Sequence, residues 1–193
     1  ILSLDGVGFS QSNGWNGVAD YSLASVGSGR LSMVDVEVSG IAFDASVFVF
    51  GIGAVEVSVK EFSCLSLTLN QHTLFSFAQQ SPTKLTLSSS TFTSINSTSM
   101  EGGILLDWCE SLTMKECTFS ECRSEAEQGS IASFRSSASV AITFSAFVGT
   151  PSGGNVTTAN TEAESVCGWN GSLVHIESVQ SATLELVTMA DSP

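Results

Sequence analysis

An eight-residue apolar pattern recurs along this 193-residue chain and constrains its fold more than any other feature. In each copy two apolar residues are separated by one residue, and a large apolar residue follows five positions after the second. The copies begin at Leu2, Leu31, Val55, Leu85, Leu112 and Val140, and a seventh begins at Leu184. Self-similarity at this spacing is typical of solenoids, in which each repeat is one structural unit stacked on the next.

A second apolar block follows each copy. The blocks cover residues 18–21, 47–50, 74–77, 103–106, 131–134 and 173–176. Gly103, Gly129 and Gly171 lie at or just before three of them, where a glycine supplies a corner with positive φ. No window has the caps and 3.6-residue period of a helix. We therefore predict an all-β, right-handed parallel β-helix of about seven coils, with 24–30 residues per coil.

The prediction treats residues 1–193 as a single β-helix segment. The step between the last two copies is longer than the others and holds one insertion, a loop over residues 148–170. The chain begins and stops inside a copy of the pattern, so we expect a fragment of a longer polypeptide. A sandwich or barrel is the competing fold. It is disfavoured because the Asn-Gly and Asp-Gly pairs do not recur at one place in the repeat.

Stacking places equivalent residues of successive coils above one another, about 4.8 Å apart. The alignment predicts two buried columns of such residues. One column is Leu2, Leu31, Val55, Leu85, Leu112, Val140 and Leu184, and the other is Phe9, Val38, Phe62, Phe92, Phe119 and Phe147.

The composition excludes several partners. Lys and Arg number six against 19 Asp and Glu, giving a net charge of −13, so the chain cannot assemble the basic face that nucleic acid or an anionic membrane requires. The longest apolar stretch, Val47–Val59, is broken by glycines and a glutamate, so we expect no direct membrane insertion. The 35 Ser and 16 Thr fit outward positions of strands and corners.

No catalytic or metal-binding pattern stands out, and we expect no cofactor and no enzyme activity. The six Asp residues fall in different columns, with Asp5 and Asp35 nearest to stacking at an offset of one position. His72 and His175 are far apart, and no Cys/His spacing indicates zinc. The alternative is a carbohydrate-active β-helix of the lyase or hydrolase type, or a carbohydrate-binding module, because acidic polysaccharides are the usual substrates of β-helix enzymes.

Five cysteines occur, an odd number that leaves at least one unpaired or bonded elsewhere. Cys117 aligns with Ser90 and Ser145, and Cys122 aligns with Leu65 and Ile95, so both are predicted to pack as small residues. The alternative is a disulfide that pins a corner, from Cys109 to Cys117 or Cys122.

Other candidate residues lie at corners and in the insertion. Asn96, Asn155 and Asn170 each begin an N-glycosylation sequon, which favours a secreted eukaryotic chain. Long loops on one face of a solenoid are commonly binding sites. Trp169, with Glu162 and Glu164 nearby, is therefore the candidate binding loop, and Trp169 either contacts a sugar or partner or anchors the loop to the rod.

The middle of the chain resembles a known class of repeat proteins. Gly102-Gly103-Ile104-Leu105 looks like a Gly-Gly-apolar strand start, and residues 119–122 look like a Phe-x-x-Asn corner with Cys in place of Asn. This segment, roughly 83–147, is similar to right-handed parallel β-helix surface proteins, namely polymorphic outer-membrane proteins of chlamydial type and related protist repeats. The resemblance implies an extracellular or cell-surface structural or adhesive region. Its expected partners are other protein chains or surface carbohydrate, with self-association end to end or laterally.

Overall fold

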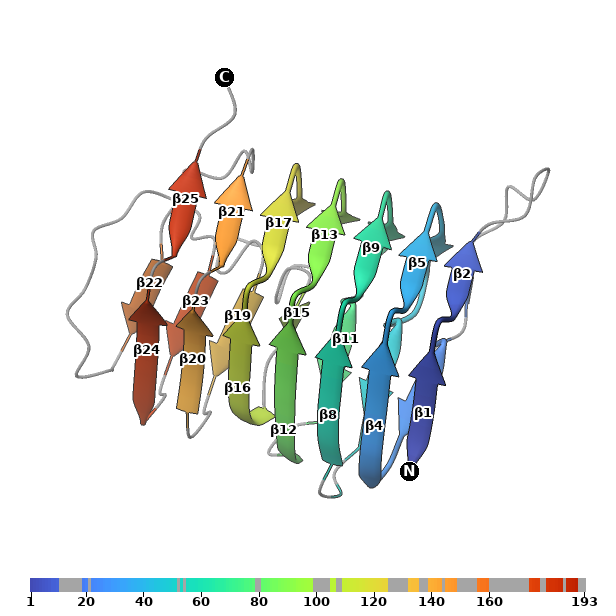
Figure 1. Ribbon diagram of the computed structural model, residues 1–193, viewed down its shortest axis with the longest axis horizontal. Helices are drawn as coiled ribbons and strands as arrows, with labels where there is room; N and C mark the ends of the chain where they lie inside the picture. Colours follow the sequence, from blue (N-terminus) through green and yellow to red (C-terminus); the bar gives the residue numbers. More distant parts are fainter. Residues whose placement is uncertain are drawn as a thin grey trace.

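The computed structural model describes residues 1–10, 19–20, 22–51, 53, 55–78, 81–98, 105–106, 109–124, 132–135, 139–143, 145–148, 156–159, 174–177, 180–185 and 187–190. Within these ranges the secondary structure is strand, with no helix, and every strand pairing is parallel. The strands form four sheets, A to D, that wind around a common core (Figure 1). The all-β parallel prediction is confirmed, and the antiparallel sandwich is excluded.

Sheets A and B each contain seven strands. Sheet A comprises β1 (Leu2–Asp5), β4 (Gly29–Val34), β8 (Val55–Lys60), β12 (Ser81–Ser88), β16 (Cys109–Lys115), β20 (Ser139–Thr143) and β24 (Ser181–Glu185). Sheet B comprises β2 (Gly8–Ser10), β5 (Glu37–Ser39), β9 (Ser63–Leu65), β13 (Thr91–Thr93), β17 (Thr118–Ser120), β21 (Ala146–Val148) and β25 (Thr188–Ala190).

Sheet C contains four strands and sheet D contains seven. Sheet C comprises β6 (Ala42–Phe43), β10 (Thr68–Leu69), β14 (Asn96–Ser97) and β18 (Arg123–Ser124). Sheet D comprises, in spatial order, β3 (Ala24–Val26), β7 (Phe48–Phe50), β11 (Phe75–Phe77), β15 (Leu105–Leu106), β19 (Ala132–Arg135), β23 (Val174–Glu177) and β22 (Val156–Ala159).

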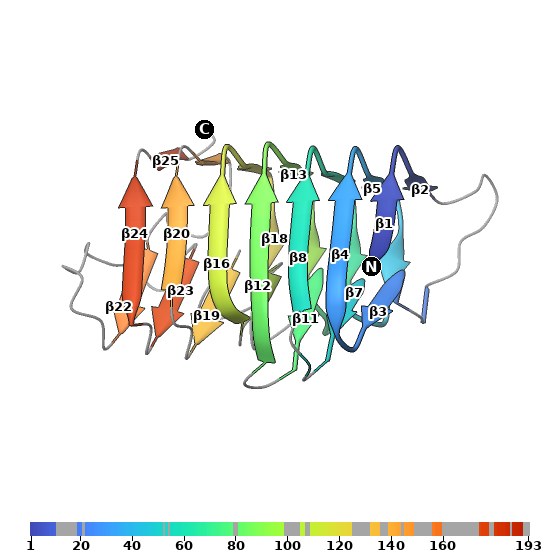
Figure 2. The same cartoon turned by 60° about the horizontal axis from the view of Figure 1, so that its bottom comes forward.

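The chain visits the sheets in the order A, B, C, D and then begins the next turn. It runs up sheet A and returns down sheet D on the other side while it advances along the axis, which makes the coil right-handed (Figures 1 and 2). Four turns, β4–β7, β8–β11, β12–β15 and β16–β19, have a strand in all four sheets. The expectation of about seven coils is therefore too high, although sheets A, B and D each stack seven strands.

The core is built from columns of inward-facing residues. One column in sheet A runs through Leu2, Leu31, Val57, Leu85, Leu112, Val140 and Ala182. The five members between Leu2 and Ala182 are buried. Burying each such side chain stabilises the folded state by about 1.5–3 kcal/mol. A single turn cannot bury its inner face alone, and the turns stacked on either side of it exclude water from that face.

The predicted register is wrong at two turns. Val57, not Val55, pairs with both Leu31 and Leu85, and Ala182, not Leu184, pairs with Val140. Both errors are shifts of two residues, which keep the same side chains on the inner face. The reason is that residues 55–59 and 182–186 each offer three alternate apolar positions, so the apolar pattern alone fits either register.

The aromatic column is also corrected. Cys64, not Phe62, pairs with Val38 and Phe92, and the column continues in register to Phe119 and Phe147. The rings of Phe92 and Phe119 stack with centroids 4.4 Å apart. Phe62 lies two residues earlier, and its ring still packs at 5.9 Å from that of Phe92. Phe62 follows the corner residue Glu61 as Ser90 follows Ser89, so the mismatch is the same two-residue shift as in β8, and the Phe62 ring remains in the core.

Five of the predicted second blocks correspond to strands of sheet D. The exception is the first, because residues 24–26 form β3, whereas Ala19 makes an isolated bridge to Phe43 beside sheet C. The insertion is also not wholly a loop, since residues 156–159 form β22 against β23. Its Val-Thr-Thr sequence favours a strand, and the edge of sheet D offers unpaired backbone groups.

Among the described residues, the corners between sheets A and B and between sheets B and C place a residue in the left-handed region. The corner between sheets A and B is at Gly6, Asp35, Glu61, Ser89 and Glu116, and the corner between sheets B and C is at Gly40, Ser66, Ser94 and Glu121, with φ between 48° and 66°. The amide of Glu61 donates to the Ser88 carbonyl of the next turn at 3.1 Å, and Ser94 donates to Ser120 at 2.9 Å. Left-handed backbone is unfavourable for residues other than glycine. The hydrogen bonds between successive turns therefore stabilise the left-handed conformation at these corners.

Truncating Phe92 tests the core. Phe92 is fully buried between Cys64 and Phe119, so Phe92→Ala should lower the free energy of unfolding by about 3–5 kcal/mol. The matched control is Thr86→Ala on the outer face of β12, which should change it by less than about 0.5 kcal/mol. Both are measured by urea denaturation, and equal losses would contradict the assigned faces.

Candidate functional site

The outer face of sheet A carries a regular column of hydroxyl side chains. Because side chains alternate across a strand, the residues between the buried positions point outward. In register they are Ser3, Ser32, Ser58, Thr86, Thr113, Ala141 and Thr183, which we call the hydroxyl column. Six of its seven members have a hydroxyl group, and neighbouring members are one strand spacing apart.

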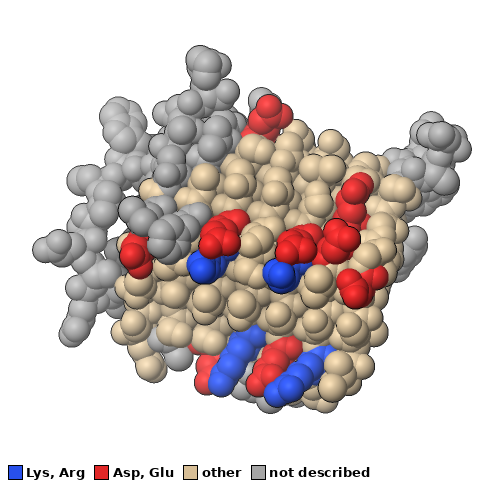
Figure 3. Space-filling view, in the orientation of Figure 1, with Lys and Arg blue, Asp and Glu red and all other residues tan. Residues whose placement is uncertain are grey.

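Rows of charged residues border this column on both sides, with an uncharged band between them (Figure 3). On one side Lys60 Nζ lies 3.0 Å from Glu61 Oε1. On the same side Lys115 Nζ lies 3.4 Å from Glu116 Oε1. On the other side Arg30 Nε lies 2.6 Å from Glu56 Oε2. All of these side chains are more than half exposed, so each pair adds little to stability. Each of the three pairs nevertheless cancels its own charge beside the column.

The hydroxyls of the column are free for external partners. Within the part of the chain that the structure describes, Ser58, Thr86 and Thr113 make no side-chain hydrogen bond. The adjacent positions differ, since Ser88 Oγ donates to the Val59 carbonyl at 3.4 Å and Ser89 Oγ donates to Glu116 at 3.1 Å. A hydroxyl both donates and accepts, so the column can match a repeating polar ligand of either kind.

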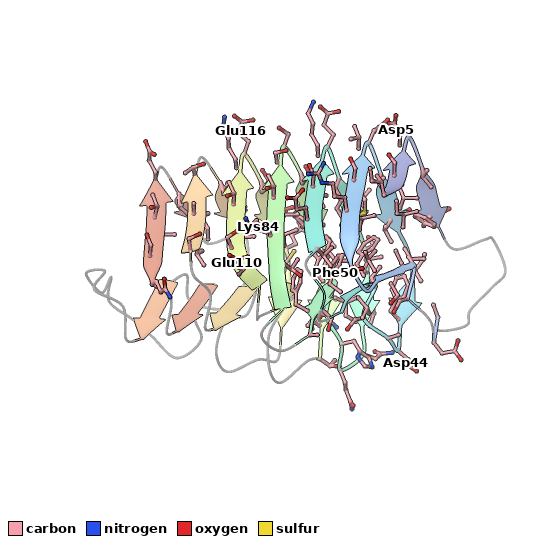
Figure 4. All side chains as sticks on the ribbon, turned by 90° about the horizontal axis from the view of Figure 1, so that it is seen from below. Asp5, Asp44, Phe50, Lys84, Glu110 and Glu116 are labelled. Atoms are coloured by element: carbon pink, nitrogen blue, oxygen red, sulfur yellow. The ribbon has the colours of Figure 1, made fainter. Side chains whose placement is uncertain are left out.

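The described residues contain no group of three or more His, Cys, Asp or Glu that could hold a metal ion. Asp5 pairs with Val34, and Asp35 occupies the following corner, so the two are offset by one position as the sequence predicts. Asp44 lies at another corner, where it accepts a hydrogen bond of 2.7 Å from Asn70. Figure 4 shows Phe50 inside the rod, while Asp5, Asp44 and Glu116 project from its outer edges. These carboxylates do not converge.

Among the described residues, no helix is long and apolar enough to cross a membrane.

The structure describes one of the three predicted glycosylation sites. Asn96 begins β14 and is exposed, between Thr68 and Arg123 in sheet C. The sequon's Ser97 is buried, and Thr98 Oγ1 accepts a hydrogen bond of 2.8 Å from the Gln71 amide. Asn155 and Asn170, and the candidate binding residues Trp169, Glu162 and Glu164, lie outside the described residues.

Cys117 and Cys122 are free, buried thiols. Cys117 is equivalent to Ser90 and Ser145, as predicted: Ser90 Oγ accepts from the Phe62 amide at 3.2 Å, and Ser145 Oγ accepts from the Cys117 amide at 3.3 Å. Each of the three side chains donates to the carbonyl two residues earlier. No disulfide joins Cys117 or Cys122 to another described cysteine, and the Cys109 side chain lies outside the described residues.

Cys122 follows a left-handed corner residue and is buried, as are Ile41, Leu67 and Ile95 at the same place in their turns. The alignment with Ile95 is therefore confirmed, but Leu67 rather than Leu65 is the equivalent residue. The error is the same two-residue shift that affects β8. Burial raises the pKa of both the Cys117 and Cys122 thiols from 9.0 to about 11. Both are therefore packing residues with protonated thiols near neutral pH.

No family model matches the chain, and neither a curated protein nor a solved structure matches it.

Cysteine replacement tests these environments. Cys117→Ser reproduces the hydrogen bonds of Ser90 and Ser145, so the free energy of unfolding should change by less than about 1 kcal/mol. Cys64→Ser places a hydroxyl between Val38 and Phe92 and should cost about 1–3 kcal/mol. Urea denaturation measures both, and equal losses would contradict the assignment.

The raised pKa values predict loss of stability in alkali. Below pH 9 the thiols are protonated in both the folded and the unfolded chain, and their contribution is fully present. Between pH 9 and about 11 the unfolded chain loses these protons first, so stability falls as pH rises. Cys117→Ser should reduce this loss in pH-dependent urea denaturation, and an unchanged pH profile would contradict the prediction.

Proposed function

We propose that this chain is a non-catalytic solenoid scaffold of an extracellular or cell-surface protein, with a structural or adhesive role. Its contact surface is the outer face of sheet A, and its partners are other protein chains or surface carbohydrate. The observation that carries the proposal is the hydroxyl column, which repeats one polar group on successive turns. A repeated, uncharged, hydrogen-bonding face suits extended contact with a repeating polymer better than recognition of one small molecule.

The electrostatics support a neutral partner. Three ion pairs within the charged rows beside the column are each neutral, and Asp5, Asp35 and Glu185 in the same rows are acidic, so this face offers little attraction for an acidic polymer. The whole chain carries a charge of −13, which repels acidic polysaccharides and nucleic acids. Neutral glycans and uncharged protein surfaces are the partner classes that this balance favours.

The arrangement of carboxylates supports the absence of catalysis. Glycoside hydrolases place two carboxyl groups on either side of the scissile bond. The described Asp residues lie singly at separate corners or strand ends, and Glu56, Glu61 and Glu116 are ion-paired with basic residues. The resemblance to surface repeat proteins supports the extracellular or cell-surface location, and exposed Asn96 is available there for a glycan.

A surface-retention assay tests the proposal. Beads coupled to the chain are passed over cellulose, chitin and immobilised fibronectin, and we expect retention on at least one. Replacing both Thr86 and Thr113 by valine removes two hydroxyls and keeps the branched shape that strands favour, so retention should fall several-fold.

The matched control replaces Thr91 and Thr118 of sheet B by valine and should keep retention. The proposal is wrong if the two double variants behave alike or if no surface retains the wild-type chain. Release of reducing sugar ends from cellulose or chitin would instead indicate the carbohydrate-active alternative.

A further inference from the structure

One position of the hydroxyl column differs from the others. Ala141 of β20 places a methyl group where every other member has a hydroxyl. Its four nearest neighbours on the outer face all carry hydroxyls. Thr113 and Thr183 lie opposite Ala141 on the adjacent strands β16 and β24, and Ser139 and Thr143 lie two residues away on β20 itself (Figure 2). We call these five residues the Ala141 patch.

This arrangement is not repeated at the other column positions that have a described strand on both sides. At Ser32, Ser58, Thr86 and Thr113, at least one of the outward residues two positions away on the same strand is charged. These charged residues are Arg30 in β4, Glu56 and Lys60 in β8, Lys84 in β12 and Lys115 in β16. Ala141 therefore has an environment of its own, a methyl group surrounded by four neutral hydroxyls.

The hydroxyls of the Ala141 patch are open to an external ligand. In the described part of the chain, the side chains of Thr113, Ser139, Thr143 and Thr183 make no hydrogen bond with other side chains or with the backbone. Ser139, Thr113 and Thr183 are exposed, and Thr143 and Ala141 are partly exposed. Three of the four hydroxyls belong to threonines, whose branched side chains are restricted at χ1. The hydroxyls are thus held in few orientations before any ligand binds.

The spacing of the patch fits one sugar ring. The hydroxyl residues on adjacent strands lie about 4.8 Å from Ala141, and those along β20 lie about 6.6 Å from it. A pyranose with equatorial hydroxyls has C–H groups on its two faces and hydroxyls pointing outward around its edge. Laid flat on the patch, it would pack its C–H face on the Ala141 methyl and direct its hydroxyls towards the surrounding hydroxyls, each of which can donate or accept a hydrogen bond.

We propose that the Ala141 patch is a subsite for one glucose or N-acetylglucosamine unit of a neutral glycan, since these neutral sugars have equatorial hydroxyls. This inference rests on the proposed contact function of sheet A and adds the sugar unit and the residues that bind it. The patch has no charged member. Lys115 and Glu185 lie on either side of Thr143 and have opposite charges, so they add no net charge beside the sugar.

A peptide strand is a poorer occupant of the same surface. Extended peptides bind sheets mainly by adding a strand to an open edge, where main-chain hydrogen bonds are available. Strand β20 is paired with β16 on one side and with β24 on the other, so its backbone groups are already used. Above β20 a ligand meets side chains alone, and these suit a ring with hydroxyls at its edge.

The variant Ala141→Ser separates the subsite from the hydroxyl column as a whole. It completes the column but replaces the methyl group beneath the sugar by a polar one. The affinity for cellotetraose or chitotetraose should therefore fall several-fold. If the number of hydroxyls alone decided binding, the affinity would stay the same or rise. Titration of the 193-residue chain with each tetrasaccharide, followed by amide chemical shifts, measures the affinity and locates the contact.

Removing hydroxyls around the methyl group gives a second test. Ser139→Ala with Thr143→Val takes away two hydrogen-bonding partners and should weaken tetrasaccharide binding at least about tenfold. The matched control, Ser63→Ala with Thr91→Val, makes the same chemical changes on the outer face of sheet B and should bind as wild type does. Circular dichroism of all variants should remain that of the folded chain.

The subsite is overturned if neither tetrasaccharide shifts the amides of residues 113, 139–143 and 183, if Ala141→Ser binds as tightly as wild type, or if the two double variants lose equal affinity. Any of these results, together with bead retention that still depends on Thr86 and Thr113, would remove the subsite and leave the proposed function. Tetrasaccharide binding at the patch by a chain that no surface retains would support the subsite and remove the proposed function.

Discussion

The structure depends on parallel, in-register pairing between equivalent residues of successive turns. This pairing satisfies the backbone of each turn and lays each inward side chain on one of similar kind, as in the stacked rings of Phe92 and Phe119. It also holds Glu61 and Ser94 in left-handed corners through hydrogen bonds to the next turn. Core, corners and outer columns are thus consequences of one repeated contact.

The fold could be predicted from the sequence because equivalent residues of successive repeats pair with each other in the sheets. The alternation of apolar residues within each repeat shows which side chains face the core. It assigned the inner face correctly even where it misplaced Val55 and Leu184, since a two-residue shift preserves the face. It placed Cys117 with Ser90 and Ser145, a column whose small hydrogen-bonding side chains recur at one point of the turn.

The remaining features had no local signal. The left-handed corners are mostly Ser, Glu and Asp rather than Gly or Asn, so nothing in the sequence marked where each turn aligns with the next, and Phe62 was matched to Phe92 in place of Cys64. Strand β22 was missed because four residues in a Gly- and Thr-rich insertion form a strand only where the edge of β23 is available. The hydroxyl column emerges only when the true register aligns outward residues that the apolar pattern ignores.

Distances between spin labels on the hydroxyl column test the central claim most directly. In-register stacking puts Ser3 and Thr113 four strands apart and Ser3 and Thr183 six strands apart. Their backbone separations are therefore about 19 Å and about 29 Å at 4.8 Å per strand. Double electron–electron resonance on the two doubly labelled chains should give mean distances that differ by about 10 Å. Equal distances, or a shorter one for Ser3 and Thr183, would contradict the stacked solenoid.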